Sequence, residues 1–584
     1  MLHAPQRISL RMSERVARAS PTIGGELPMC GIAGFIGPSH EKATDLIVSA
    51  SRMATAIRHR GPDDGGAWAD EREGIALGHR HLSAAGHQPM QSANGRYITV
   101  FNGEIYNHLD LRTSLHSVAG PLEWRGRSDT ETLLASFSQW GVTATLTKAK
   151  GMFALAVWDR EERTLTLARD RVGEKPLYYG WQGTTFLFGS ELKALRAHPA
   201  FNASVDPGAL ALLLRYNYIP APYAIYQGIR KLPAGTYLRI GPGQRDTAPV
   251  PYWSFTEIAE HGAEHPFTGT DQDALTALEL QLGNAVRGQM VADVPLGALL
   301  SGGIDSTAIT ALMQQHSSRP VKTFTIGFDE ERYDEAAHAR IVAAHLGTDH
   351  AELRLSGSDA LALVPRMSSM YDEPLADSSQ LPTHLVMALA RQSVAVALSG
   401  DAGDELFGGY NRYIHGPKTW QRVRRVPPSV RRALGSAMTA IPAHTVNKLF
   451  GAFAAHAGIA LPGDKAHKLG SRLSNIGSID DLFVSLVSEW SDPGSMVIGG
   501  YIPNNLVDQR SDWPKLKHPV ARMMALDSLT YLPDDILVKV DRASMAVSLE
   551  TRAPFLDHDV ISFAWSLPMH MKIRNGETKW LLRR

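Results

Sequence analysis

Two glycine-rich loops, each directly after a short apolar run, constrain the fold of this chain more than any other feature. The run at 295–300 leads into the loop SGGIDS at 301–306, and the run at 394–398 leads into SGDAGDE at 399–405. Apolar runs of this length are typical of buried strands, and helical periodicity follows them. Alternating strands and helices predict a doubly wound parallel sheet, with both loops at its carboxyl edge, where ligands bind. Further predicted elements here are a strand at 321–326 and helices at 307–315 and 334–346.

The residue types of the two loops predict phosphate binding. Glycine lets the backbone approach an anion, and the helix that follows presents free N–H groups and its positive dipole end. The first loop lacks the Gly-Lys-Ser/Thr ending of the kinase-type loop, so a plain turn is the alternative if it is taken alone. The second loop adds carboxylates at the same edge, which makes Asp305 and Asp404 candidate ligands of Mg²⁺. The alternative for these two aspartates is that they cap helices.

The first part of the chain follows a different pattern. Short β-branched, aromatic and aliphatic runs bounded by Gly, Asn and Asp predict a β-rich α+β domain from residue 30 to about 240. The clearest predicted strands are at 97–101, 152–158, 164–168 and 186–188. The stretch 241–269 has no steady periodicity and is expected to link the two domains, while the chain beyond about 421 is expected to be mostly helical.

Composition excludes several classes of function. With 59 Lys and Arg against 59 Asp and Glu, and no basic stripe, the charge does not favour a nucleic-acid partner. No apolar run reaches the roughly 18 to 20 residues that cross a bilayer, so no membrane segment is expected. The chain has one cysteine, so it cannot form an intramolecular disulfide, and we expect a cytoplasmic location.

The single cysteine, Cys30, directly follows Met29. If Met29 is the true start and is removed, the α-amine of Cys30, with a reference pKa of about 8, can serve as the base for its thiol. Residues 1–29 would then be an N-terminal extension or a misassigned start, although the arginines of 1–28 are also faintly similar to a transit peptide. The alternative for a lone cysteine at the start of a strand is a buried small hydrophobic residue.

Further motifs decide between these interpretations. They are HRGPD at 59–63, NGEIYN at 102–107, SDTE at 128–131, DEP at 372–374, LPDD at 532–535 and ETRAPF at 550–555. With Cys30 and the two loops, they identify the chain as a member of the glutamine-hydrolysing asparagine synthetase family, from Met29 almost to the end. The resemblance implies an Ntn-hydrolase-type αββα glutamine amidotransferase domain at 30–240, a linker at 241–269 and an ATP-pyrophosphatase-type domain with a helical C-terminal part at 270–584.

The resemblance also implies roles for individual residues. Cys30 would attack the glutamine amide, and the Asn102 side chain with the Gly103 N–H would form the oxyanion hole. Glu104 and Asp129 would hold the glutamine α-amine. In the second domain Asp401 would assist the attack of ammonia on an acyl adenylate, and Asp305 and Asp404 would bind Mg²⁺. The residues expected to bind ATP are Leu300, Ser301, Gly302, Gly303, Ile304, Asp305, Ser306, Ser399 and Gly400.

Two departures from the family pattern stand out. His81 occupies the position where relatives usually have an arginine that clamps the glutamine α-carboxylate, and a neutral imidazole cannot form that bidentate pair. This predicts weakened glutamine binding, with Arg80 or Arg58 as possible substitutes. The chain also stops at Arg584, where relatives usually continue with a further helix and a loop that carries a lysine. The sequence is either a fragment or a truncated gene product, and the second case predicts a weak synthetase.

The leading hypothesis is synthesis of asparagine from aspartate, ATP and glutamine, with a homodimer as a possible assembly. Alternatives are amidation of another carboxylate, such as a surface-polysaccharide uronate or a natural-product precursor, and a catalytically impaired scaffold or regulatory protein. The intact Cys30, Asn102, Asp305 and Asp404 argue against the last of these.

Overall fold

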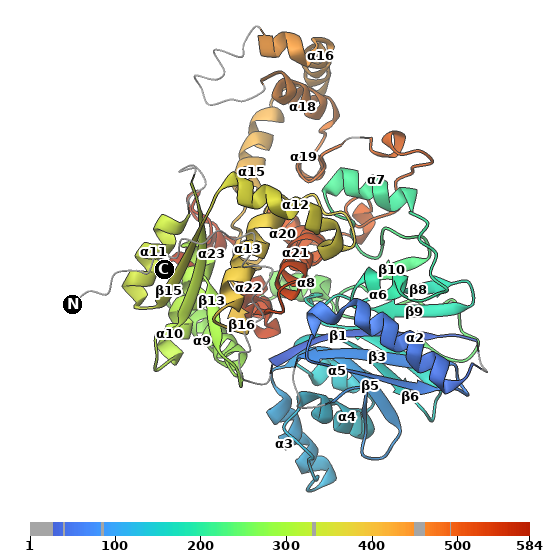
Figure 1. The fold of residues 1–584 in the computed structure, drawn as a ribbon. Helices are drawn as coiled ribbons and strands as arrows, with labels where there is room; N and C mark the ends of the chain where they lie inside the picture. The colour runs from blue at the N-terminus through green and yellow to red at the C-terminus, as the bar shows by residue number, and fades with distance from the viewer. Residues whose placement is uncertain (1–26, 39–40, 83–86, 330–334, 449–461, 491) are drawn as a thin grey trace.

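The computed structural model describes residues 27–38, 41–82, 87–329, 335–448, 462–490 and 492–584. Its N-terminal half contains two six-stranded sheets, and its C-terminal half contains a five-stranded sheet with helices packed against it (Figure 1). Residues 1–26 of the extension predicted at 1–29, and the first residue of the helix predicted at 334–346, fall outside the described residues.

The two N-terminal sheets are antiparallel and account for the strands predicted at 97–101, 152–158, 164–168 and 186–188. The first sheet has the order β10-β8-β9-β1-β3-β2, with β1 Leu27–Ile36, β2 Asp64–Asp70, β3 Ile75–Leu82, β8 Tyr178–Gln182, β9 Thr185–Gly189 and β10 Ile229–Lys231. The second has the order β12-β11-β7-β6-β5-β4, with β4 Met90–Gln91, β5 Tyr97–Ile105, β6 Gly151–Asp159, β7 Thr164–Arg169, β11 Thr236–Ile240 and β12 Val250–Pro251.

The two sheets pack face to face between helices. Ile32 and Leu77 of the first sheet meet Val100 and Leu167 of the second in one buried core. Helix α2 (Ala43–Ala56) covers the outer face of the first sheet, and α3 (His108–Ala119), α4 (Asp129–Trp140) and α5 (Val142–Lys148) lie against the second. Because both faces of β6 are covered, it is buried along nearly its whole length. The αββα layering predicted from the sequence is confirmed.

The C-terminal sheet is entirely parallel, with the order β15-β14-β13-β16-β17. Its strands are β13 Leu296–Leu299, β14 Lys322–Phe328, β15 Asp349–Leu355, β16 Val396–Leu398 and β17 Glu550–Arg552. The strand order reverses between β13 and β16, which are the strands that carry the two glycine-rich loops. The predicted doubly wound sheet is therefore confirmed, and both loops lie at its topological switch point.

Two elements differ from the sequence-based expectation. Strand β17 lies within the region expected to be helical, where three residues are too few to give a periodic signal. The stretch 241–269, which lacked periodicity, contains β12 and helix α8 (Phe255–Glu264), capped by Ser254. The buried face of α8 includes Gly262, where a Cβ would lie 2.6 Å from the backbone of Trp565. A helix face made partly of Gly and Ala packs closely, but these small residues give no clear hydrophobic periodicity in the sequence.

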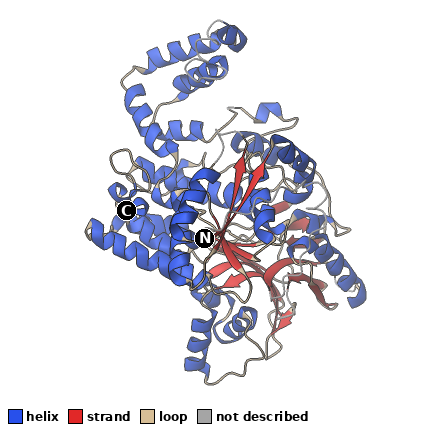
Figure 2. Ribbon diagram, turned by 60° about the vertical axis from the view of Figure 1, so that its left-hand side comes forward, coloured by secondary structure: helices blue, strands red, loops and turns tan. Residues whose placement is uncertain are grey.

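The remaining helices surround the parallel sheet, and α15, α16 and α18 project away from the rest of the molecule (Figures 1 and 2). Their bounds are α6 Leu192–Arg196, α7 Pro207–Tyr216, α9 Asp271–Gln289, α10 Ile304–His316, α11 Ala336–Leu346, α12 Gly357–Tyr371, α13 Gln380–Arg391, α14 Gly403–Phe407, α15 Asn411–Val423, α16 Pro428–Ala440, α18 Pro462–Asn475, α19 Ile479–Leu486, α20 Pro519–Leu529, α21 Leu537–Met545, α22 His558–Ser566, α23 Met569–Lys572 and α24 Trp580–Arg583. Shorter turns are η1 Arg58–Arg60, η3 Gly494–Met496, η4 Arg510–Asp512, the π-helix η5 Leu532–Ile536 and η6 Pro554–Leu556. No helix in the described ranges has both the length and the apolar character that crossing a membrane requires.

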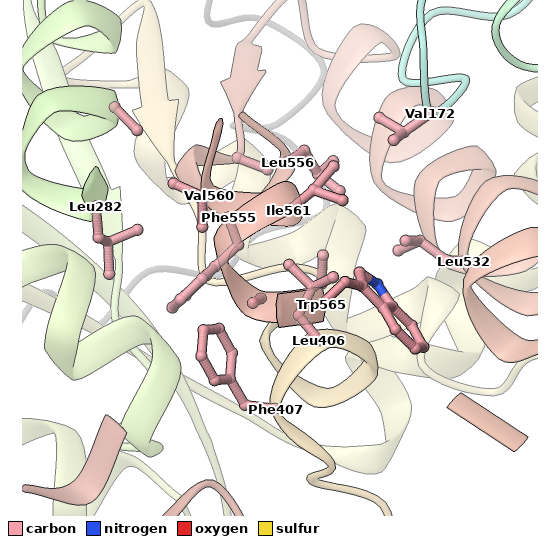
Figure 3. Packing of buried hydrophobic residues seen from close by; sticks show 14 of the residues in the cluster. Val172, Leu282, Leu406, Phe407, Leu532, Phe555, Leu556, Val560, Ile561 and Trp565 are labelled. Carbon is pink, nitrogen blue, oxygen red and sulfur yellow. The ribbon is translucent and has the colours of Figure 1, made fainter. Parts of the chain in front are cut away.

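The two halves share a hydrophobic core. In the close view of Figure 3, Phe407, Phe555 and Trp565 pack in the C-terminal half, and Val172 of the N-terminal half belongs to the same buried cluster. The halves are therefore joined by apolar packing as well as by the chain.

Candidate active sites in the two halves

The sheet register of the N-terminal half places Cys30 directly opposite His81. Cys30 on β1 pairs with His81 on β3, and the Cys30 Sγ lies 2.9 Å from the His81 Nδ1. Both side chains are buried. The position predicted to clamp the glutamine carboxylate thus holds an imidazole in direct contact with the thiol.

A second pair of predicted residues lies on β5, which packs against β1. The Asn102 side chain is buried, and its Nδ2 has no hydrogen-bond partner among the described residues. At Gly103 the backbone φ is +153°, and a Cβ would lie 2.0 Å from the Met152 carbonyl oxygen, so only glycine fits. An unpartnered amide N–H₂ and a glycine N–H on one strand are suitable donors for an oxyanion.

The carboxylates predicted to hold an α-amine come from β5 and the start of α4. Asp129 Oδ2 accepts a hydrogen bond from the Ile105 N–H at 2.9 Å, which fixes it against the strand that carries Glu104. Burial raises the pKa of both carboxyl groups above their usual range. Glu104 also lies 3.7 Å from the Arg552 guanidinium, which comes from β17 of the other half.

The environment of Cys30 opposes ionisation of its thiol. Burial raises its pKa most, and the carboxylates of Asp129, Glu550 and Glu104 raise it further, while Arg60 lowers it. The thiol is therefore protonated at rest, and a base must take its proton before it can act as a nucleophile.

Arg60 connects this site to the C-terminal half. Its Nε donates to the Cys30 carbonyl at 3.3 Å, its Nη1 donates to Glu191 at 2.8 Å, and its Nη2 donates to Asp541 at 2.7 Å. All four residues are buried. Arg60 stands within the HRGPD motif, but the sequence did not indicate that its guanidinium is shared between the halves.

In the C-terminal half the two glycine-rich loops touch each other. The Ser301 N–H donates to the Ser306 Oγ at 3.2 Å, which closes the first loop, and Gly303 precedes α10 without a side-chain cap. At Gly302 φ is +77°, and a Cβ would lie 2.6 Å from the Ala339 nitrogen. A Cβ at Gly400 of the second loop would lie 2.7 Å from the Ser306 nitrogen. The two loops therefore form one cradle rather than two separate turns.

Lys579 lies between the two predicted metal ligands. Its Nζ contacts Asp305 Oδ2 and lies 2.7 Å from Asp404 Oδ1. The other oxygen of Asp305 is buried without a hydrogen-bond partner in the described part of the chain, and burial raises the pKa of this carboxyl group to about 6. The residue before each helix is Gly303 or Ala402, and neither aspartate caps a helix. Two carboxylates with an unused oxygen fit a hard cation such as Mg²⁺.

No motif in the sequence points to Lys579. A signal is present in the backbone, where this non-glycine residue has φ +51°, a conformation that is rare outside strained or functional positions. The sequence alone gives no indication of that angle. Nor does it place residue 579 beside residue 305.

Asp401 lies where the two halves meet. Its Oδ2 accepts a hydrogen bond from the Ser399 hydroxyl at 2.7 Å, and burial raises the pKa of its carboxyl group. It lines a cavity of about 20 Å³ together with Glu174 of the N-terminal half and Arg552 of the C-terminal half. A cavity of that size holds one water-sized molecule.

Comparisons with known proteins agree with this division into two sites. A family model described as glutamine amidotransferase domain matches residues 29–253, and one described as asparagine synthase matches residues 277–584. The chain belongs to the asparagine synthase family. It therefore combines a glutamine amidotransferase domain with a synthetase domain of a family that uses ATP.

Curated relatives match across both domains. A putative glutamine-hydrolysing asparagine synthetase of Mycobacterium tuberculosis strain H37Rv is 34% identical, covering 95% of this chain and 84% of that protein. Asparagine synthetase 1 of Bacillus subtilis strain 168 is 31% identical with the same coverage. Amidase chry2 of Gibberella zeae is 28% identical over 94% of this chain and 84% of its own length.

A solved structure of glutamine phosphoribosylpyrophosphate amidotransferase from B. subtilis covers 55% of this chain and 65% of that chain at 16% identity and a TM-score of 0.29. That score is too low to support an argument. The fold assignment therefore comes from the strand order described above.

Proposed function

We propose that this chain is a glutamine-dependent asparagine synthetase. Residues 30–240 would release ammonia from glutamine, and residues 270–584 would activate aspartate with ATP and amidate it. The observation that carries the proposal is a buried thiol in contact with His81 and an Asn102 donor without a partner among the described residues, in the same molecule as a two-loop phosphate cradle.

In the first reaction the Cys30 sulfur attacks the amide carbon of glutamine. The Asn102 Nδ2 and the Gly103 N–H stabilise the oxyanion, ammonia leaves, and water hydrolyses the thioester to glutamate. Glu104 and Asp129 hold the α-ammonium group. Hydrogen bonds that form only in the transition state are the ones that accelerate the reaction, and the Asn102 Nδ2, which has no partner among the described residues, is available to form one.

Which group acts as the base for the thiol depends on whether the peptide bond between Met29 and Cys30 has been cleaved. In the structure Cys30 is joined to Met29 within β1, so its α-amine becomes available only after that bond is cleaved. Where the bond is intact, the His81 Nδ1 at 2.9 Å is placed to accept the proton. His81 is therefore not free to clamp the glutamine carboxylate. Arg80 points to the opposite face of β3, which leaves Arg58 as the candidate clamp.

In the second reaction the aspartate side-chain carboxylate attacks the α-phosphorus of ATP, which gives an acyl adenylate and pyrophosphate. The cradle at 301–306 and the ammonium group of Lys579 would bind the pyrophosphate moiety. Asp305 and Asp404 would hold Mg²⁺, which neutralises phosphate charge when bound. Ammonia then displaces AMP, with Asp401 placed to assist at the cavity between the halves.

The experiment that tests the proposal measures AMP and pyrophosphate formed with glutamine as the nitrogen donor, across aspartate and other carboxylates. The N-terminus of the same protein is read by mass spectrometry. Aspartate is expected to give the highest rate. Release of ADP and phosphate instead of AMP and pyrophosphate would contradict the adenylation step.

A second candidate is amidation of a carboxylate other than aspartate. It is favoured by the match of fungal relatives named amidases over 94% of this chain, because that match spans both domains. The same assay separates the two candidates, since a uronate or another acid would then outperform aspartate.

A further inference from the structure

Three buried ligand groups surround the thiol of the N-terminal site. The Cys30 Sγ and one ring nitrogen from each of His79 and His81 all lie within 4.8 Å of one another. Their exposed fractions are 3%, 1% and 7%. The sheet explains the grouping, because residues 79 and 81 are two apart on β3 and face the same side, and Cys30 is opposite residue 81 on β1.

One ring nitrogen of His79 is available to bind a ligand. Its Nε2 donates to the Phe101 carbonyl at 3.1 Å, which fixes the tautomer and leaves the lone pair on Nδ1. That Nδ1 is buried and has no hydrogen-bond partner among the described residues. Burial lowers the pKa of the ring to about 3, so the imidazole is neutral and able to bind a metal.

Charged groups of both signs lie near the cluster. Burial is the largest cause of the raised pKa of the Cys30 thiol, the carboxyl groups of Asp129, Glu550 and Glu104 raise it further, and Arg60 lowers it. A bound divalent cation would stabilise the thiolate that this environment disfavours. A buried histidine with an unpartnered nitrogen is costly unless something binds there.

We propose that Cys30, His79 and His81 form a binding site for Zn²⁺ that switches off the N-terminal reaction. One thiolate and two neutral imidazoles are ligands that Zn²⁺ prefers, and three protein ligands leave a fourth position for water. Binding forms an S–Zn bond, releases the thiol proton to solvent and involves no change in oxidation state. The inhibitory effect rests on the proposed role of Cys30 as nucleophile, whereas the metal site itself does not.

The binding test uses the full chain, stripped of metal with a chelator and titrated with CoCl₂ or ZnCl₂. We expect one of the bound cobalt ions to give a thiolate-to-cobalt charge-transfer band, and zinc to displace that ion. Cys30→Ser should abolish the band, and His81→Gln should weaken zinc affinity by more than about 100-fold. His558→Ala is the matched control, because Asp557, His558 and Asp559 form a second candidate metal cluster nearer the surface. That variant should keep the band and the affinity.

Absence of the charge-transfer band in the unmodified chain, or zinc affinity unchanged by Cys30→Ser, would overturn the site. Circular dichroism and ammonia-dependent AMP formation show that each variant is folded. In the activity arm, zinc should stop glutamine hydrolysis and spare ammonia-dependent AMP formation, and a chelator should restore the first reaction. If cobalt gives the thiolate band but zinc leaves glutamine hydrolysis untouched, the proposed nucleophile is wrong while the metal site stands.

Discussion

The two sites place their reactive groups in different kinds of structure. The Cys30 thiol lies on a strand inside a sandwich of two sheets, and burial and three carboxylates oppose its ionisation. The carboxylates of Asp305 and Asp404 lie in the first turns of α10 and α14, directly after loops that follow parallel strands, and the Asp404 side chain is 37% exposed. The first site is built to hold a neutral group until a base acts. The second keeps charged groups in place before substrate arrives.

The difference also concerns how each site balances buried charge. Near Cys30, the Arg60 guanidinium is already bound to Glu191 and Asp541, so little of its charge is left for the thiol. At the loops, the Lys579 ammonium contacts both carboxylates directly. We infer that a phosphate ligand exchanges with an existing ion pair, whereas glutamine meets an Asn102 donor that has no partner among the described residues.

The largest difference between the two sites is expected when the Cys30 thiol is removed. Cys30→Ala should lower glutamine-dependent AMP formation by more than about 10⁴-fold, because the covalent route is lost. Ammonia-dependent AMP formation should persist, since the loops are intact. Both rates are measured on one preparation. Equal losses of the two activities would show that the sites are not separable.

The next largest effect should come from the unpaired amide. Asn102→Ala removes one oxyanion donor and should lower kcat for glutamine hydrolysis by about 10² to 10³-fold with little change in KM. Asn107→Ala is the control within the same motif, because Asn107 bonds the backbone at Lys148 and Lys150 and not the site. A change in KM alone would mean that Asn102 binds the ground state.

A smaller effect is expected at the ion pair of the loops. Lys579→Met should slow ATP–pyrophosphate exchange by about 10²-fold, because Asp305 and Asp404 then repel both each other and the phosphates. Glutamine hydrolysis should be unaffected. Arg583→Ala, at an exposed residue of α24, the helix that directly follows Lys579, is the control. Exchange at the unmodified rate in the methionine variant would remove Lys579 from the phosphate site.

The junction between the sites gives a stability prediction. Asp541→Asn removes a charge-assisted partner of Arg60 and should lower the free energy of unfolding in urea by about 2 kcal/mol. Lys150→Met breaks an exposed pair that also joins the halves, Lys150 with Asp559, and should cost less than about 1 kcal/mol. If the two variants lost similar amounts of free energy of unfolding, the buried pair would contribute no more to stability than the exposed one.

The smallest effect is a pH dependence confined to the first site. Glu104 and Asp129 must be ionised to hold an ammonium group, and burial raises the pKa of both, so they are protonated at pH values where ordinary carboxyl groups are charged. Burial raises the pKa of Asp129 to about 6 and that of Glu104 to about 8, so the kcat/KM for glutamine hydrolysis should rise about tenfold between about pH 7 and about pH 9 as Glu104 ionises. Glu104→Gln should flatten this rise. A flat profile in the unmodified chain would contradict the assignment.

The sequence predicted most of the framework of the second site. The loops at 301–306 and 399–405 each follow a short apolar run, and parallel topology brings such loops together whatever the connecting chain does. Lys579 could not be found in this way, since it lies 274 positions from Asp305 and its place depends on how α24 packs. Strand β17 was missed because a three-residue edge strand has no period to detect.

For the first site the sequence predicted which residues take part but not which side chains contact each other. Residues 30, 102 and 103 could be singled out by resemblance, and their strands by composition. The contact between Cys30 and His81 depends on the register of β1 against β3, and a shift by one residue would turn His81 to the other face. The unpaired nitrogens of His79 and Asn102 depend on side-chain packing that no local pattern encodes.

The apolar cluster that joins Val172 to Phe407, Phe555 and Trp565 limits how this molecule can move. A hinge motion that separated the halves would expose that cluster to water and remove Asp541 as the ion-pair partner of the Arg60 guanidinium. Opening and closing as rigid bodies is therefore too costly to accompany each turnover. Either half expressed by itself would expose an apolar surface to water. Separate expression of the two domains should therefore yield aggregating fragments rather than two active enzymes.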